Sequence, residues 1–201
     1  MYKLTSPKFV VIHHSVTDSF YQTGLNIVKN QQKKYGKDSV RDAYHYMVTG
    51  DGYIIPWIPE NVVSGHCGLD GNNNWTIPCN FNSLAVCFLG DFEKKEIPEK
   101  QFELGLVLIK TLVKKYYIID IVGHRDIIAT ECPGKNLYKL IPEIKKEVFM
   151  DWKEDVINWA LQKGLITSQD WLKNKDKPIT IAELLAIIKN LTDKLKIEIG
   201  G

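Results

Sequence analysis

The chain has 201 residues, of which 44% are hydrophobic and 25% are charged, and its formal net charge at pH 7 is +2. That length allows one well-buried domain and a small second one, and the composition excludes an intrinsically disordered chain. The small net charge gives no reason to expect a nucleic-acid partner. No stretch approaches the roughly 18 consecutive apolar residues of a transmembrane helix, so we expect no membrane insertion.

The N-terminal segment and the cysteines indicate where the protein is made. After the first eight residues, only four consecutive apolar residues, Phe9–Ile12, come before the first histidine, and this run is too short for the core of a signal peptide. We therefore expect synthesis in a cytoplasm, and we interpret the cysteines first as free thiols or metal ligands rather than disulfide partners. The four are Cys67, Cys79, Cys87 and Cys132. A Cys67–Cys79 bridge remains open for a protein that ends up outside the cell.

Apolar runs predict three strands in the first 60 residues. Lys8–His13 is a β-branched and aromatic run typical of a buried strand. Asn26–Tyr35 carries a weak helical stripe, so we expect a surface helix there. Asp42–Thr49 and Tyr53–Ile58 are predicted strands, and the Gly-Asp-Gly segment at 50–52 joins them through a hairpin turn.

The middle of the chain alternates between strands and helices after one long loop. Ser64–Ser83 is rich in glycine and asparagine and has no period, so we expect a loop, of a length that usually has a function. Leu84–Gly90 and Tyr117–Val122 are predicted strands. A helix with an apolar stripe starts at Pro98 between them, and Leu137–Phe149 is a later helix. This order predicts an α/β fold, with a mixed central β-sheet flanked by helices.

The chain changes character after residue 150. Asp151 is the expected N-cap of a helix that ends at Gly164. Thr180 and Glu183 form a capping box that starts a second helix, which reaches about Lys196. We therefore expect a first domain over residues 1–150 and a small helical module over residues 151–201. A unit of that size is marginal alone, so it should dock on the first domain or pair with a copy of itself.

A histidine and a thiol eight positions apart point to a metal site. His124 and Cys132 lie in the loop Gly123–Gly134, which can bring both donors to one ion as a straight helix or strand could not. His13, at the end of the first strand, is the best third ligand, because catalytic zinc sites use three protein ligands and keep one position open. The alternative is a hydrogen-bonded core histidine at position 13 and a surface turn at residues 124–126.

Five motifs, taken together, resemble the zinc-dependent N-acetylmuramoyl-L-alanine amidases, a superfamily that includes amidase-type phage lysozymes and peptidoglycan recognition proteins. In chain order they are His13–Thr17, Tyr44–Tyr46 ahead of Gly50–Gly52, Ser64–His66, Asn82–Leu84, and Gly123–Asp126 followed by Thr130–Gly134. The resemblance implies the amidase fold and one zinc ion per chain, with His13, His124 and Cys132 as ligands. His14 then lies on the opposite face of its strand and is structural.

The resemblance also implies residues that assist catalysis. It places a catalytic hydroxyl at Tyr44, which would otherwise be an ordinary sheet aromatic, and a second at Thr130, where some members carry lysine. Some relatives have a glutamate as general base in the strand where this chain has Cys87. That departure leaves the identity of the base open and gives more weight to the two hydroxyls.

The reaction implied by the resemblance is hydrolysis of the amide between N-acetylmuramic acid and L-alanine in peptidoglycan, by a zinc-activated water. Asn82 and His66 are then expected to bind substrate. For His66, the alternative is an ordinary solvated loop histidine.

The C-terminal module resembles, more weakly, a wall-binding unit of the surface-layer-homology type. Trp159 and Ala160 ahead of Gly164, and the segment 178–184, carry this likeness, but Ile181 stands where an arginine is usual. Wall binding and a dimerisation or packing role both remain open.

These expectations combine into one functional hypothesis. We expect a phage or prophage endolysin that stays in the host bacterial cytoplasm until it is released to the cell wall, where its partner is peptidoglycan. Its C-terminal module could also form a homodimer. The alternatives are a non-catalytic peptidoglycan-binding protein and a cytoplasmic wall-recycling amidase.

Overall fold

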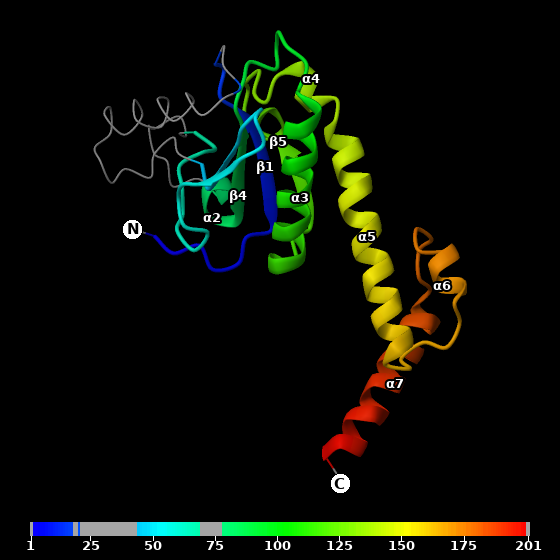
Figure 1. Cartoon of the computed structure of the whole chain (residues 1–201). Helices are drawn as coiled ribbons and strands as arrows, with labels where there is room; N and C mark the ends of the chain where they lie inside the picture. The colour runs from blue at the N-terminus through cyan, green and yellow to red at the C-terminus, as the bar shows by residue number, and fades with distance from the viewer. Residues whose placement is uncertain (1, 18–19, 21–43, 69–77, 200–201) are drawn as a thin grey trace. The chain divides into compact units, whose positions relative to one another are not determined.

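Figure 1 shows the computed structural model of the chain, which describes residues 2–17, 20, 44–68 and 78–199. The surface helix expected at Asn26–Tyr35 lies outside the described residues. The chain divides into two compact units, Met1–Val148 and Phe149–Gly201. This division falls close to the expected domain boundary at residue 150. Among the described residues, no helix is long and apolar enough to cross a membrane.

The first unit is built on a five-stranded mixed sheet in the order β3-β2-β4-β1-β5. The strands are β1 (Phe9–His14), β2 (Tyr46–Val48), β3 (Ile54–Pro56), β4 (Ser83–Phe88) and β5 (Asp120–Gly123). All neighbours pair in parallel except β2 and β3, which form the expected antiparallel hairpin. Helices pack against this sheet, so the predicted α/β class with a mixed central sheet is confirmed (Figure 1).

The central strands are apolar because both of their faces are covered. Val10, Val11 and Ile12 of β1 are fully buried, as is the apolar run of β4. Such continuous runs are typical of parallel strands with both faces covered, whereas a one-sided sheet would alternate apolar and polar residues. β1 therefore lies inside the sheet, between β4 and β5, and its last residues reach the edge where the neighbouring parallel strands also end.

Helix α3 (Glu99–Tyr116) covers one face of the sheet (Figure 1). It buries Leu108, Ile109 and Leu112, and its Gly105 lies so close to Phe88 of β4 that an added Cβ would stand 2.3 Å from the ring. The strand expected to start at Tyr117 begins at Asp120 instead. The reason is that Tyr117 adopts a left-handed conformation, with φ of 53°, and its N–H caps the helix by donating to the Val113 carbonyl.

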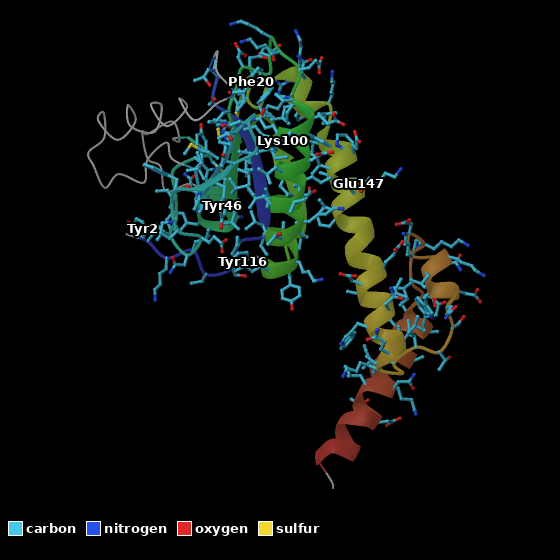
Figure 2. All side chains as sticks on the ribbon, in the orientation of Figure 1. Tyr2, Phe20, Tyr46, Lys100, Tyr116 and Glu147 are labelled. Atoms are coloured by element: carbon cyan, nitrogen blue, oxygen red, sulfur yellow. A yellow bond between two sulfur atoms is a disulfide. The ribbon has the colours of Figure 1, made fainter. Side chains whose placement is uncertain are left out.

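A half-buried carboxylate ties the end of α3 to the sheet. Glu60 accepts hydrogen bonds from the hydroxyls of Tyr46 in β2 and Tyr116 in α3, and from the Lys115 ammonium. Figure 2 labels the two tyrosines on these elements. Three donors on one carboxylate fix the helix against the hairpin, because removing any partner would leave a half-buried polar group unpaired.

Two local expectations about the helices are corrected. The long loop at 64–83 contains a short helix, α2 (Pro78–Asn82), at its end. The expected helix break near residue 150 is wrong, because α5 runs continuously over Ile141–Gln162 after the short α4 (Lys135–Tyr138). No proline or glycine stands near Asp151, so nothing in the local chain ends the helix there, and a capping residue type does not by itself start a new helix.

The second unit is a small helical cluster. Ala160, Leu165 and Ile166 are buried together, with Trp171 and Ile187 packed against them. The unit includes α6 (Asp170–Lys173) and α7 (Ile181–Ile199). The expected capping box at the start of α7 is confirmed, since the Glu183 carboxylate accepts the Thr180 N–H at 2.8 Å and the Glu183 N–H donates to the Thr180 hydroxyl at 3.2 Å.

A buried histidine makes the stability of the first unit pH-dependent. The ring of His45 is fully buried, lies 3.0 Å from the Val62 carbonyl through Nε2, and accepts the Ala85 N–H through Nδ1 at 2.9 Å. Burial lowers the pKa of His45 from 6.5 to about 4. The unfolded chain therefore binds a proton at a pH where the folded chain does not, and stability present above pH 6.5 is lost as the pH falls towards 4.

We predict that acidification from pH 7.5 to 4.5 costs the wild-type chain more free energy of unfolding than it costs His45→Gln. The difference should be about 3 kcal/mol, since each unit of pKa shift corresponds to about 1.4 kcal/mol. Urea denaturation of both proteins at both pH values, with metal removed by a chelator, measures this difference. Equal losses in the two proteins would contradict the assignment.

Candidate metal centre

Three side chains that could hold a metal meet at the carboxyl ends of β1 and β5. They come from the end of β1 (His13), from the first residue after β5 (His124), and from the loop that follows (Cys132), and one donor atom from each lies within 4.8 Å of the others. Parallel pairing sets Ile12 opposite Gly123, so the next residue of each strand is a histidine at the same edge. The rings of the two histidines are 4.5 Å apart between centroids.

The loop 123–134 folds back to deliver the thiol. The carbonyl of Cys132 accepts the Arg125 N–H at 2.8 Å, and its own N–H donates to the Thr130 hydroxyl at 3.2 Å. Gly134 has a φ of 86°, and a Cβ there would stand 2.4 Å from the backbone of Phe92, so only glycine fits. The backbone N–H of His14 points at the Cys132 sulfur at 3.5 Å.

One ring nitrogen of His124 is a buried polar atom without a partner. Nε2 of this ring is shielded from solvent and makes no hydrogen bond. Burial holds the pKa of His124 below its ordinary value, while a hydrogen bond with the Cys67 backbone opposes that shift. An unpartnered buried nitrogen is costly unless it binds something, and a metal ion would satisfy it.

The protonation states of the group fit a zinc ion. Burial, followed by the neighbouring histidines, holds the pKa of His13 well below its ordinary value, so this ring is neutral at pH 7, as a metal ligand must be. Burial raises the pKa of the Cys132 thiol to about 11, so a metal that binds here must displace its proton. Two neutral imidazoles and one thiolate are a donor set suited to zinc.

The expected catalytic hydroxyls lie beside this group. The ring of Tyr44 is 5.1 Å from the ring of His13, and its hydroxyl makes a hydrogen bond with the Cys87 thiol. The Thr130 hydroxyl accepts the N–H of the candidate ligand Cys132, so this hydroxyl also lies close to the group. Parallel pairing sets Cys87 directly opposite His13. His14, as expected, turns to the other face, where its Nδ1 accepts the Phe92 N–H at 3.2 Å.

His66 and Asn82, the two residues expected to bind substrate, lie behind His13 and at the start of β4, respectively. His66 is only 4% exposed and lies behind His13, with 3.0 Å between His66 Nδ1 and His13 Nε2, so it is neither a rim residue nor a solvated loop histidine. Asn82 immediately precedes β4, at the opposite end of that strand from Cys87, and its amide lies against the carbonyls of Pro78 and Cys79. Substrate binding by either residue stays a prediction.

Two of the cysteines are joined, which corrects their first interpretation as free thiols. Cys67 and Cys79 form a disulfide, whereas Cys87 and Cys132 are free. The bridge closes the described ends of the long loop. Asn80 holds the backbone of Cys67 beside this bridge, since its side-chain oxygen accepts the Cys67 N–H at 2.8 Å.

Ser83 belongs to the motif Asn82–Leu84, but the sequence alone indicated no role for it. Its hydroxyl lies 3.2 Å from His66 Nε2 and 2.5 Å from the carbonyl of Cys79. The signal available in the sequence was a serine directly before the apolar run Leu84–Phe88.

We predict that the purified wild-type chain retains about one zinc ion and that Cys132→Ser loses it on dialysis against a chelator. The hydroxyl of serine is a far weaker zinc ligand than a thiolate. Cys87→Ser makes the same atomic change at a thiol outside the ligand set and should keep its zinc. Elemental analysis after dialysis measures both variants, and full occupancy in Cys132→Ser would refute its role as a ligand.

The comparisons with known proteins agree with this geometry. Residues 3–135 match the family model described as N-acetylmuramoyl-L-alanine amidase (Amidase_2). Peptidoglycan-recognition protein SC2 from Drosophila simulans is 28% identical over 153 residues, which cover 72% of this chain and 75% of that protein.

Solved structures show the same likeness. The N-acetylmuramoyl-L-alanine amidase LysC from Clostridium intestinale superposes with a TM-score of 0.56 at 26% identity, over 74% of this chain and 93% of LysC. Peptidoglycan recognition protein LE, solved in complex with tracheal cytotoxin, superposes with a TM-score of 0.56 at 25% identity, over 72% of this chain and 82% of that one. Since the family model covers well over half of the sequence, the chain belongs to the N-acetylmuramoyl-L-alanine amidase family.

Proposed function

We propose that this chain is a zinc-dependent amidase that cleaves the bond between N-acetylmuramic acid and L-alanine in peptidoglycan. The observation that carries the proposal is the ligand group itself: two neutral imidazoles and a thiol converge, and Nε2 of His124 lacks any other partner. Three protein ligands match a catalytic zinc site, which keeps a further position for water or substrate. A protein that only binds peptidoglycan would have no need of this group.

The chain's own residues divide the chemical work. His13, His124 and Cys132 would hold the ion, and bound zinc supplies Lewis-acid chemistry, polarising the substrate carbonyl and lowering the pKa of a water to about 7. The ring of Tyr44 lies beside the ring of His13, and we assign its hydroxyl the bond to an oxygen that gains negative charge as the amide is attacked. Thr130 uses an oxygen lone pair to accept the Cys132 N–H, so its own proton is available for a second such bond.

Cys87 does not replace the glutamate that some relatives use as a base. Burial raises the pKa of this thiol well above its ordinary value, so it stays protonated at neutral pH and cannot accept a proton there. β4 carries no carboxylate in its sequence SLAVCF. We therefore assign the assisting role at this face of the sheet to Tyr44, with the Cys87 thiol as the neighbour that orients its hydroxyl.

We further propose that the protein is an endolysin of phage or prophage origin that works on the cell wall after release from the host cytoplasm. The family membership supports this proposal, as does the likeness to a second Clostridium intestinale amidase, LysCS, which is described as an endolysin. A wall-recycling amidase acts on soluble fragments and would need no appended module.

The C-terminal unit is the part that we assign to targeting or to pairing with a second copy. Its helix α7 leaves a row of large apolar side chains exposed among the described residues: Ile181, Leu184, Leu185, Ile188 and Leu191. An exposed apolar row of this kind marks a surface that binds something.

Digestion of purified peptidoglycan tests the proposed activity. The wild-type chain should release new L-alanine amino termini without new reducing sugar ends, because an amidase cuts the amide and leaves the glycan intact. A binder without activity would sediment with the wall and release neither. New reducing ends, or no products at all with zinc bound, would contradict the proposal.

We predict that Tyr44→Phe lowers kcat by about 100-fold while the zinc content stays at the wild-type level. Loss of one oxyanion donor typically costs at least that factor in rate. Tyr46→Phe is the matched control, because its hydroxyl bonds to Glu60, away from the ligand group, and its turnover should be close to wild type. If Tyr44→Phe turns over as fast as the control, the assisting role lies elsewhere.

A further inference from the structure

A chain of buried hydrogen bonds runs from His13 away from the ligand group. His13 Nε2 lies 3.0 Å from His66 Nδ1, and His66 Nε2 lies 3.2 Å from the Ser83 hydroxyl. The Ser83 hydroxyl in turn lies 2.5 Å from the Cys79 carbonyl oxygen. The three side chains are 4% exposed or less, so no solvent competes for these bonds.

The carbonyl at the end fixes the direction of every bond in the chain. A carbonyl oxygen can only accept, so the Ser83 hydroxyl donates its one proton to Cys79. The Ser83 oxygen then accepts from His66 Nε2–H. A neutral imidazole carries one proton, so His66 Nδ1 is an acceptor and must receive Nε2–H from His13.

This direction determines which atom of His13 can bind a metal. With its proton on Nε2, His13 has its free lone pair on Nδ1, and Nδ1 is the nitrogen 3.7 Å from the Cys132 sulfur. The opposite tautomer would put a proton between the ring and the ligand group and would set two lone pairs, on His13 and His66, against each other.

The second histidine of the group, His124, is also linked to the Cys67–Cys79 disulfide. A hydrogen bond with the backbone of Cys67 opposes the lowering of the His124 pKa, and Nε2 of this ring is a buried nitrogen without a partner. Cys67 and Cys79 are bonded to each other. One cross-link therefore carries both backbone positions on which the two histidine ligands are anchored.

We propose that His66, anchored by Ser83, is a positioning residue that fixes His13 in the tautomer and ring orientation needed to bind zinc. The proposal rests on the zinc site proposed above and assigns His66 a role that requires no contact with substrate or metal. Partners that orient metal-binding histidines in this way typically change metal affinity by 10- to 100-fold when they are removed.

The zinc dissociation constants of full-length variants test the proposal, measured by competition with a chromophoric chelator. His66→Leu fills the same space without polar atoms, and its dissociation constant should rise by about 10- to 100-fold. His66→Gln keeps one acceptor and one donor and should retain most of the wild-type affinity. His45→Gln changes a neighbouring buried histidine whose nitrogens bond only backbone atoms, and it should bind zinc as wild type does.

A second readout separates positioning from general damage to the fold. The ¹⁵N spectrum of the metal-free wild-type chain should show His13 protonated at Nε2, and Ser83→Ala should weaken that signature while the protein stays folded. If wild type binds zinc and His66→Leu binds it equally well, or if His66→Gln loses as much affinity as His66→Leu, the positioning role is refuted. A wild-type chain that binds no zinc would instead overturn the proposed zinc site itself.

Discussion

The parallel pairing of β1 between β4 and β5 is the constraint on which the site depends. It sets Ile12 opposite Gly123 and His13 opposite Cys87, so three strand ends deliver their side chains to one edge of the sheet. A shift of one residue along β1 would turn His13 to the face that now holds His14. The fully buried apolar residues of β1 prevent such a shift, because they must stay in the core. The hydrophobic core therefore sets the geometry of the polar site.

Burying so many imidazoles has a cost that the fold offsets with specific partners. His13, His45 and His66 are all buried and neutral, with pKa values below the ordinary value. His45 bonds to backbone groups on both sides and serves structure alone. His13 and His66 bond to each other, and the nitrogens that remain face the ligand group on one side and Ser83 on the other. Among the described residues, Nε2 of His124 is the one buried ring nitrogen without a hydrogen-bond partner, and it lies within the candidate metal group.

Much of the fold followed from local patterns in the sequence. The apolar runs of β1 and β4, the glycine-rich hairpin between β2 and β3 and the amphipathic α3 were all predicted, because each has a period or a turn residue with a clear physical meaning. The start of β5 and the continuous α5 were not predicted. The start of β5 depends on the left-handed conformation of Tyr117, which is uncommon for residues other than glycine and asparagine. The continuous α5 was missed because Asp151 was interpreted as an N-cap, although no helix-breaking residue stands near it.

The sequence predicted the three candidate ligands but not the residues that surround and orient them. His13, His124 and Cys132 belong to motifs that a sequence can show, and the structure brings them together. The places of His66 and Ser83 depend on a disulfide and on the conformation of a long loop, and neither has a periodic signature. The expectation of free thiols, based on the lack of a signal-peptide core, also argued against the Cys67–Cys79 disulfide that the structure contains. Contacts between loops that are far apart in sequence cannot be predicted from local sequence patterns.

The central claim is that His13, His124 and Cys132 bind one zinc ion, and X-ray absorption at the zinc edge of the purified wild-type chain tests it most directly. The account predicts one sulfur neighbour at about 2.3 Å and two imidazole nitrogens at about 2.0 to 2.1 Å, with a light-atom neighbour completing four-coordination. A spectrum without a sulfur shell, or with two or more sulfur neighbours, would contradict it.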